Sequence, residues 1–95
     1  MALTYHEQLD LKNTAQLREL VKELPAFASD FFRAMEIKKA TNTRRNYAYD
    51  LNTFFYFLRT QNPYFKDKDI RTLPVSILDD IQPVDIEEYL SFLTY

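Results

Sequence analysis

The sequence of 95 residues contains no cysteine and no glycine. Without cysteine, the chain can form no disulfide, no thiolate metal site and no cysteine nucleophile. Phosphate-cradling loops need glycine, because their backbone must adopt positive φ and approach the anion closely. Nucleotide binding of the Walker or dinucleotide type is therefore not expected. Tight hairpins with Asn-Gly or Asp-Gly turns are absent as well, so the sequence favours an all-α fold.

Long apolar runs are also missing. No stretch of about 18 apolar residues occurs, and the first residues lack the basic-then-apolar pattern of a signal peptide. We therefore expect a soluble, cytoplasmic protein that does not contact a membrane. Apolar residues at 46% and aromatics at 16% are enough for one core. A chain of this length forms one domain at most.

The net charge of −2 conceals an uneven distribution along the chain. Residues 33–66 carry seven basic side chains against two acids, whereas residues 67–95 carry two basic side chains against seven acids. This basic centre between acidic flanks is more informative than the overall pI near 5.3.

Apolar spacing predicts three main helices in the first two thirds of the chain. The first covers residues 14–24, with Asn13 as N-cap and an interruption at Pro25. The second covers 26–38 and the third 42–60, ending at Asn62-Pro63. Their predicted core faces are Leu17, Leu20, Val21 and Leu24 in the first, Phe27, Phe31, Phe32 and Met35 in the second, and Tyr47, Leu51, Phe54 and Leu58 in the third, with Phe55 and Phe57 beside it.

Two further helices are predicted after a polar connection over residues 61–73. A short one starts at Pro74 and another at Pro83, since proline suits the first turn of a helix. The expected buried residues are Ile77, Leu78 and Ile81 in the short helix, and Ile86, Tyr89, Leu90 and Leu93 in the last, with Phe92 beside them.

The face of the 42–60 helix opposite its predicted core carries groups that suit DNA. Arginine binds phosphate, asparagine reads base edges, and tyrosine adds hydroxyl hydrogen bonds. The residues concerned are Asn42, Arg45, Tyr49, Asn52 and Tyr56. Spacing alone favours the alternative, an ordinary solvated face whose two tyrosines are covered by a neighbouring helix.

Basic residues also cluster where the second and third helices meet. Lys38, Lys39, Arg44 and Arg45 lie within eight positions, so that four cations could meet one phosphate strand. The alternative is a junction whose charges serve solubility.

The residue types of a catalytic or metal site do not come together in this sequence. The acids between Asp79 and Glu88 flank a helix start, where solvation and the helix dipole explain them. His6 is the single histidine, and no serine has a neighbouring histidine or an elbow glycine. We therefore expect no catalytic residue, no metal, no cofactor and no small-molecule ligand.

Two segments of the chain carry a family pattern, namely TRRNYAYDLNTFFYFL at residues 43–58 and DIEEYLSFL at residues 85–93. In this order they resemble the core-binding domain of tyrosine recombinases, the phage integrases and Xer-type proteins. The long connection between them is most similar to Xer-type single recombinases of Gram-positive cocci. Together they cover roughly 30 residues.

The resemblance implies a small helical bundle of the sterile-alpha-motif-like type that clamps a recombination core site beside other recombinase subunits. Residues 1–40 would form an N-terminal helical pair, and residues 41–95 a partial set of core-binding helices in one compact domain. The family's catalytic residues belong to a separate domain, and the family pattern continues beyond Tyr95. We therefore expect a core-binding domain truncated at its C-terminus, without the catalytic domain and not an enzyme by itself.

The resemblance also implies DNA contacts along the 42–60 helix. The expected contact residues are Asn42, Thr43, Arg45, Asn46 and Tyr49, followed by Asn52 and Tyr56, with Lys38, Lys39 and Arg44 as phosphate anchors. The expected activity is binding of double-stranded DNA during DNA integration, either for chromosome-dimer resolution or for a mobile element. The alternative function is a helical protein-interaction module without DNA affinity.

Overall fold

Four α-helices and two short 3₁₀-helices make up the computed structural model, which describes residues 2–36 and 38–94. The α-helices are α1 (Tyr5–Lys22), α2 (Ala28–Met35), α3 (Thr41–Gln61) and α4 (Pro83–Thr94), and the 3₁₀-helices are η1 (Ile70–Thr72) and η2 (Val75–Asp80). Within these residues there is no strand, so the predicted all-α fold is confirmed as a small helical bundle.

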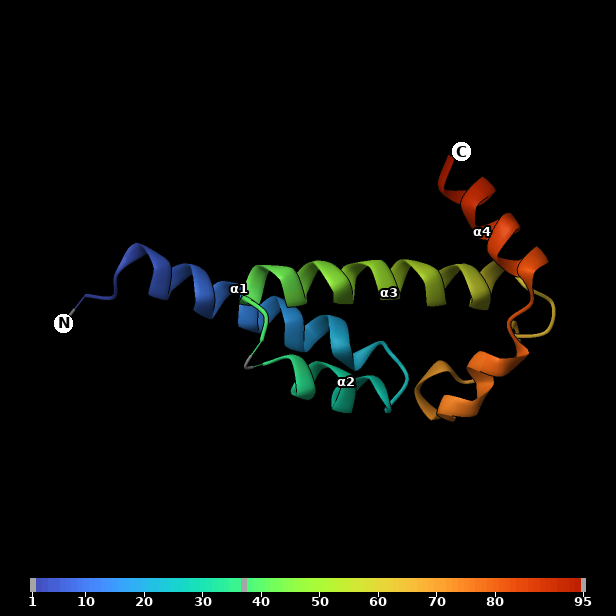
Figure 1. Cartoon of the computed structure of the whole chain (residues 1–95), viewed down its shortest axis with the longest axis horizontal. Coiled ribbons are helices and arrows are strands. Elements are labelled where there is room, and N and C mark those ends of the chain that lie inside the picture. The colour runs from blue at the N-terminus through green and yellow to red at the C-terminus, as the bar shows by residue number, and fades with distance from the viewer. Residues whose placement is uncertain (1, 37, 95) are drawn as a thin grey trace.

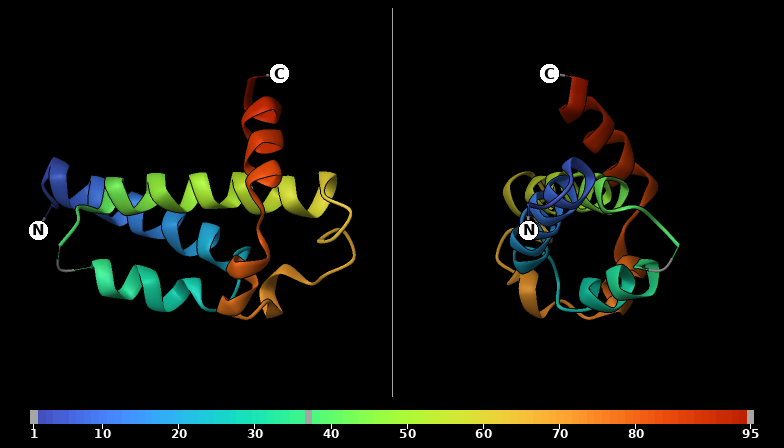
Figure 2. Two further views of the ribbon diagram at one scale, coloured as in Figure 1. Left: turned by 45° about the vertical axis from the view of Figure 1, so that its right-hand side comes forward. Right: turned by 90° about the vertical axis from the view of Figure 1, so that its left-hand side faces the viewer.

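The long helix α3 is the centre of the bundle (Figure 1). α1 lies along its N-terminal half and runs in the same direction, and the short α2 runs back on the side of α1 away from α3 (Figure 1). α4 leaves the far end of α3 and points away from α1 and α2 in each view (Figures 1 and 2). α1, α2 and α3 share one core, because Leu17, Phe32 and Phe55 belong to one cluster of buried residues.

α1 begins nine residues earlier than the predicted start at residue 14. Thr4 is its N-cap, and the hydroxyl Oγ1 accepts a hydrogen bond from the Glu7 backbone N–H at 3.1 Å. The same hydroxyl donates to Glu7 Oε1 at 2.9 Å. Thr4-x-x-Glu7 is a capping pair that sequence reasoning overlooked in favour of Asn13.

The buried faces of α2 and α3 differ from the predicted ones. In α2, Phe32 is buried but Phe31 is exposed, and in α3 Tyr47 is exposed whereas Phe55 and Phe57 are buried. The prediction of a single buried stripe on α3 was incomplete, because this helix packs against neighbours on two sides. Ala48 and Phe55 lie on the side toward α1, and Phe54 and Phe57 contact Tyr89 of α4.

The last two predicted helices are present, with corrections. The segment after Pro74 is a 3₁₀-helix in which Ile77 is buried and Leu78 exposed. α4 starts at Pro83 as predicted, yet within Pro83–Thr94 no residue is fully buried. Its contacts with α3 come from Tyr89 and Phe92, so most of the predicted stripe remains exposed.

The molecule is elongated, with extents of 53 × 29 × 22 Å and a radius of gyration of 15.5 Å. A compact chain of this length has a radius of gyration of about 12 Å. The chain is therefore more extended than a compact chain of this length, because α1 extends beyond α3 at one end and α4 projects at the other (Figure 1). None of the described helices is both long and apolar enough to cross a membrane.

Candidate nucleic-acid interface

Three cations come together where α2 gives way to α3, and we call Lys38, Lys39 and Arg44 the junction cluster. The backbone N–H groups of Lys38 and Lys39 both donate to the carbonyl of Met35, at 3.1 and 3.0 Å, which closes the end of α2. Arg44 donates from Nε to the carbonyl of Lys39 at 3.3 Å. Both lysines are exposed and Arg44 is half-buried, so the cluster presents positive charge around the N-terminus of α3.

The first turns of α3 add polar groups next to the junction cluster. Asn42 and Asn46 are exposed, and Thr43 is half-buried. Tyr49 lies two turns into the helix and keeps 62% of its surface exposed, although it borders a shallow depression against α1. These groups can reach a partner without any rearrangement of the backbone.

Two of the expected contact residues are instead bound to α1. Arg45 donates from Nη1 to Asn13 Oδ1 at 3.0 Å and to Gln16 Oε1 at 3.2 Å. Asn52 donates from Nδ2 to the carbonyl of Leu20 at 2.8 Å. The expectation that this whole face is open is therefore wrong at Arg45 and Asn52.

The physical reason for this coverage is the register of α1 on α3. The hydrogen bonds between the two helices join residues 28 to 32 apart in sequence, from Asn13 with Thr41 to Leu20 with Asn52. A nearly constant offset means that the two helices run parallel, so α1 follows the same face of α3 for several turns. The buried Asn13 is the centre of this contact, because its amide accepts from Arg45 and also donates to Thr41 Oγ1 at 3.4 Å.

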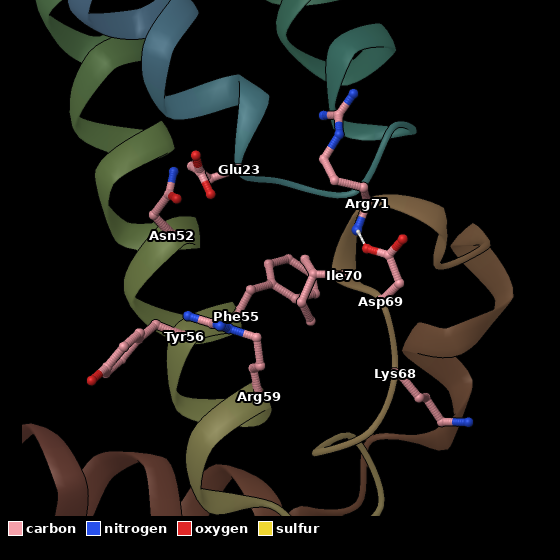
Figure 3. Close-up of a pocket in the computed structure, with 9 residues that line it drawn as sticks. All are labelled: Glu23, Asn52, Phe55, Tyr56, Arg59, Lys68, Asp69, Ile70 and Arg71. Carbon is pink, nitrogen blue, oxygen red and sulfur yellow. Dashed lines mark hydrogen bonds between the residues drawn. The ribbon is translucent and has the colours of Figure 1, made fainter.

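Tyr56, the last expected contact residue, lies in the C-terminal half of α3 beside a pocket of about 370 Å³. Figure 3 shows its ring directed away from the other lining residues. The Arg59 guanidinium lies 5.8 Å from that ring. The charged lining of the pocket consists of the cations Arg59, Lys68 and Arg71 and the acids Glu23 and Asp69. None of the junction-cluster residues lines it, so the pocket does not extend the positive surface of that cluster.

A second depression, which sequence reasoning missed, lies between α1 and α2 and has a volume of about 410 Å³. We call it the α1–α2 groove. Its apolar lining is Leu17, Val21 and Phe32, and its charged lining is Arg18, Lys22, Arg33, Arg44 and Arg71, with Glu36 as the acid. The signal was present in sequence as basic residues next to the apolar stripe of the first helix, but only the folded chain unites them.

The acidic residues of the described chain do not form a cluster of metal ligands. Within residues 2–36 and 38–94, no three histidine or acidic side chains converge to hold a metal ion. Asp85 has a structural role, since its carboxylate accepts from Asn62 Nδ2 at 2.9 Å and from the Gln82 backbone N–H at 2.8 Å. A hydrogen bond to Asp80, together with the negative charge of Asp80, raises the pKa of Tyr64.

Comparison of the chain with protein-family models, with curated proteins and with solved structures gives no match. The resemblance to tyrosine recombinases therefore rests on the two sequence segments described above.

Proposed function

We propose that this chain binds duplex DNA as a core-binding domain of the kind found in tyrosine recombinases. The observation that carries the proposal is the junction cluster beside the open first turns of α3. Lys38 and Lys39 are exposed, and Arg44 is tied to the backbone of Lys39, so three cations are held at one helix start. Phosphate binding at such a place gains from both side-chain charge and the free N–H groups of the helix.

Under this proposal the expected contact residues have three different roles. Lys38, Lys39 and Arg44 are the phosphate anchors, and Asn42, Asn46 and Tyr49 are the groups that reach into a groove. Arg45 and Asn52 hold α1 in place and act on DNA only through the position of α3. A change at Arg45 would therefore disturb the fold together with any binding, which makes it a poor probe of DNA contact.

Salt dependence of binding tests the proposal directly. Three neutralised phosphates give a slope of about −2.7 for log K against log[salt]. The double variant Lys38→Ala/Lys39→Ala removes two of these contacts, so its slope falls to about −0.9 and its affinity for every duplex decreases. Fluorescence anisotropy with a labelled duplex at several salt concentrations measures both quantities.

A matched control removes the same number of charges at the far end of α3. Lys66 and Lys68 follow the C-terminus of α3, which is about 30 Å long. The variant Lys66→Ala/Lys68→Ala is expected to bind almost as the wild type does. Equal binding by wild type and the Lys38/Lys39 variant at low salt would refute the assignment of the junction cluster to phosphate contact.

The alternative function, a helical protein-interaction module, is favoured by one separate observation. α4 exposes Val84, Ile86, Leu90 and Leu93 on a helix that projects from the bundle. Under this alternative, neither the wild type nor any variant binds duplex DNA with a measurable salt dependence.

A further inference from the structure

The exposed apolar residues of α4 form a regular stripe. Ile86, Leu90 and Leu93 follow at i, i+4 and i+7, which places them on one side of the helix. Their exposed fractions are 41%, 57% and 52%, although leucine and isoleucine are usually buried. The stripe lies beside the Tyr89 and Phe92 contacts with α3, so α4 has one covered apolar side and one uncovered apolar side.

The charges on α4 are all negative. The helix carries Asp85, Glu87 and Glu88 and no basic residue between Pro83 and Thr94. Asp85 is occupied by Asn62 and Gln82, whereas Glu87 and Glu88 are exposed. On a helical wheel Glu87 lies at the edge of the apolar stripe and Glu88 on the opposite side of the helix. α4 is therefore an amphipathic helix with an acid beside its apolar stripe, the type of element that binds in a groove through anchors at these spacings.

The α1–α2 groove has the complementary chemistry. Its lining combines three apolar side chains with five cations and one acid. Lys22 and Arg33 pair with Glu19 and Asp30 on their own helices, at 3.0 and 3.2 Å. These pairs are exposed, so they are worth little and yield readily to another acid.

Arg18 is the groove cation with the most freedom to meet an incoming acid. It lies on the exposed side of α1 and takes part in neither of the two ion pairs found in the described part of the chain.

We propose that α4 of one copy of this chain docks in the α1–α2 groove of a second copy. The copy's own α4 points away from α1 and α2 in each view, so it does not fill the groove of the same molecule (Figures 1 and 2). Charge complementarity selects the occupant, because an acidic amphipathic helix meets a cationic groove with an apolar floor. The inference does not depend on DNA binding: the groove shares Arg44 with the junction cluster, but neither Lys38 nor Lys39 lines it.

The contact is heterologous, because two different surfaces of the chain meet. Such contacts generate a closed ring when the rotation between copies closes, and an open chain otherwise. Each copy also offers one groove and one α4, so self-association depends on concentration and continues beyond a pair unless the ring closes.

Sedimentation velocity over a concentration series, without DNA, tests the proposal. The wild type is expected to gain mass as its concentration rises. Ile86→Ser/Leu90→Ser removes two anchors that are exposed in the monomer, so it weakens association at least about tenfold while thermal unfolding changes little. A wild type that remains monomeric throughout would overturn the proposal.

Charge reversal on each side separates this contact from pairing of α4 with itself. Glu87→Lys/Glu88→Lys alters α4, and Arg18→Glu/Arg33→Glu alters the groove. Each variant alone is expected to stay monomeric, whereas an equimolar mixture associates, because each copy supplies the intact half that the other lacks. Association of the groove variant alone, equal to that of the wild type, would show that the groove is not the binding surface.

The DNA-binding experiment and the self-association experiment can fail independently of each other. Lys38→Ala/Lys39→Ala is expected to self-associate as the wild type does, whatever its affinity for DNA. Loss of self-association in that variant would contradict the separation of the two surfaces.

Discussion

The two halves of α3 are held by different chemistry. Its N-terminal half is fixed to α1 by polar groups, with Thr41 donating to Asp10 Oδ1 at 2.7 Å and Arg45 bound to Asn13. Its C-terminal half is fixed by hydrophobic contacts, with Phe57 at 5.2 Å from Phe92, ring centre to ring centre. Polar contacts specify which residues face each other, whereas apolar burial supplies most of the free energy of folding.

Asn62 links the second half of α3 to the chain that follows. It is buried at the end of α3, where its Oδ1 accepts from the Tyr64 backbone N–H at 2.9 Å and its Nδ2 donates to Asp85. One amide therefore ends α3, shapes the turn and positions the start of α4. Even the hydrophobic half depends on a single polar residue for its geometry.

The largest expected effect comes from shortening the side chain of Leu58, which is fully buried in the C-terminal half of α3. Leu58→Ala removes apolar contacts and leaves a cavity, so the free energy of unfolding is expected to fall by about 2–5 kcal/mol. Urea denaturation followed by far-UV circular dichroism measures the change. Leu11→Ala, at an exposed position of α1, serves as a control and should alter stability by no more than about 0.5 kcal/mol.

A smaller effect is expected in the polar half at Asn13, which is 1% exposed. Asn13→Ala removes an acceptor from Arg45 and a donor from Thr41, so stability should fall by about 1–3 kcal/mol. Asn13→Asp keeps an oxygen beside the guanidinium and is expected to recover much of the loss. If the alanine variant is as stable as the wild type, the polar contacts do not hold this half of α3.

The smallest effect concerns how the stability of the protein depends on pH through Tyr89 of α4, which packs on the C-terminal half of α3. Burial raises the pKa of Tyr89, and the negative charge of Asp50 adds to the shift. The folded state therefore favours the neutral phenol of Tyr89. The stability that this phenol contributes to the folded state is fully present below the unfolded pKa of about 10, and it is lost as the pH rises through the folded pKa. Tyr89→Phe has no hydroxyl to ionise, and urea titrations between about pH 9 and 11 should show a shallower decline than in the wild type.

Element positions were largely predictable from local sequence signals. Pro83 marks the start of α4, and Asn62-Pro63 marks the end of α3 within one residue of the prediction. The start of α1 was wrong because Asn13 and Thr4 are both good caps by type, and the choice between them depends on what surrounds Asn13. Asn13 is buried against Thr41 and Arg45, which are 28 and 32 residues away.

The candidate site was predictable in composition but not in arrangement. Lys38 and Lys39 are exposed at the junction between α2 and α3, where the basic residues in the sequence had predicted a positively charged surface. Arg44 and Arg45 are adjacent, yet Arg45 binds α1 whereas Arg44 binds the junction backbone and lines the α1–α2 groove. Helical periodicity shows that neighbouring residues point in different directions, but it does not show which direction another helix will cover.

The sequence by itself determined that this protein is helical, where most of its helices end and that its positive charge is concentrated in the middle of the chain. These properties depend on residue type, proline positions and apolar spacing, all of which act over a few residues. Tertiary structure alone decided which face of α3 is covered by α1, which side of α4 is left exposed and how Arg18 and Arg33 come to line one groove. These outcomes depend on the register between helices, which is set by contacts between residues far apart in the chain.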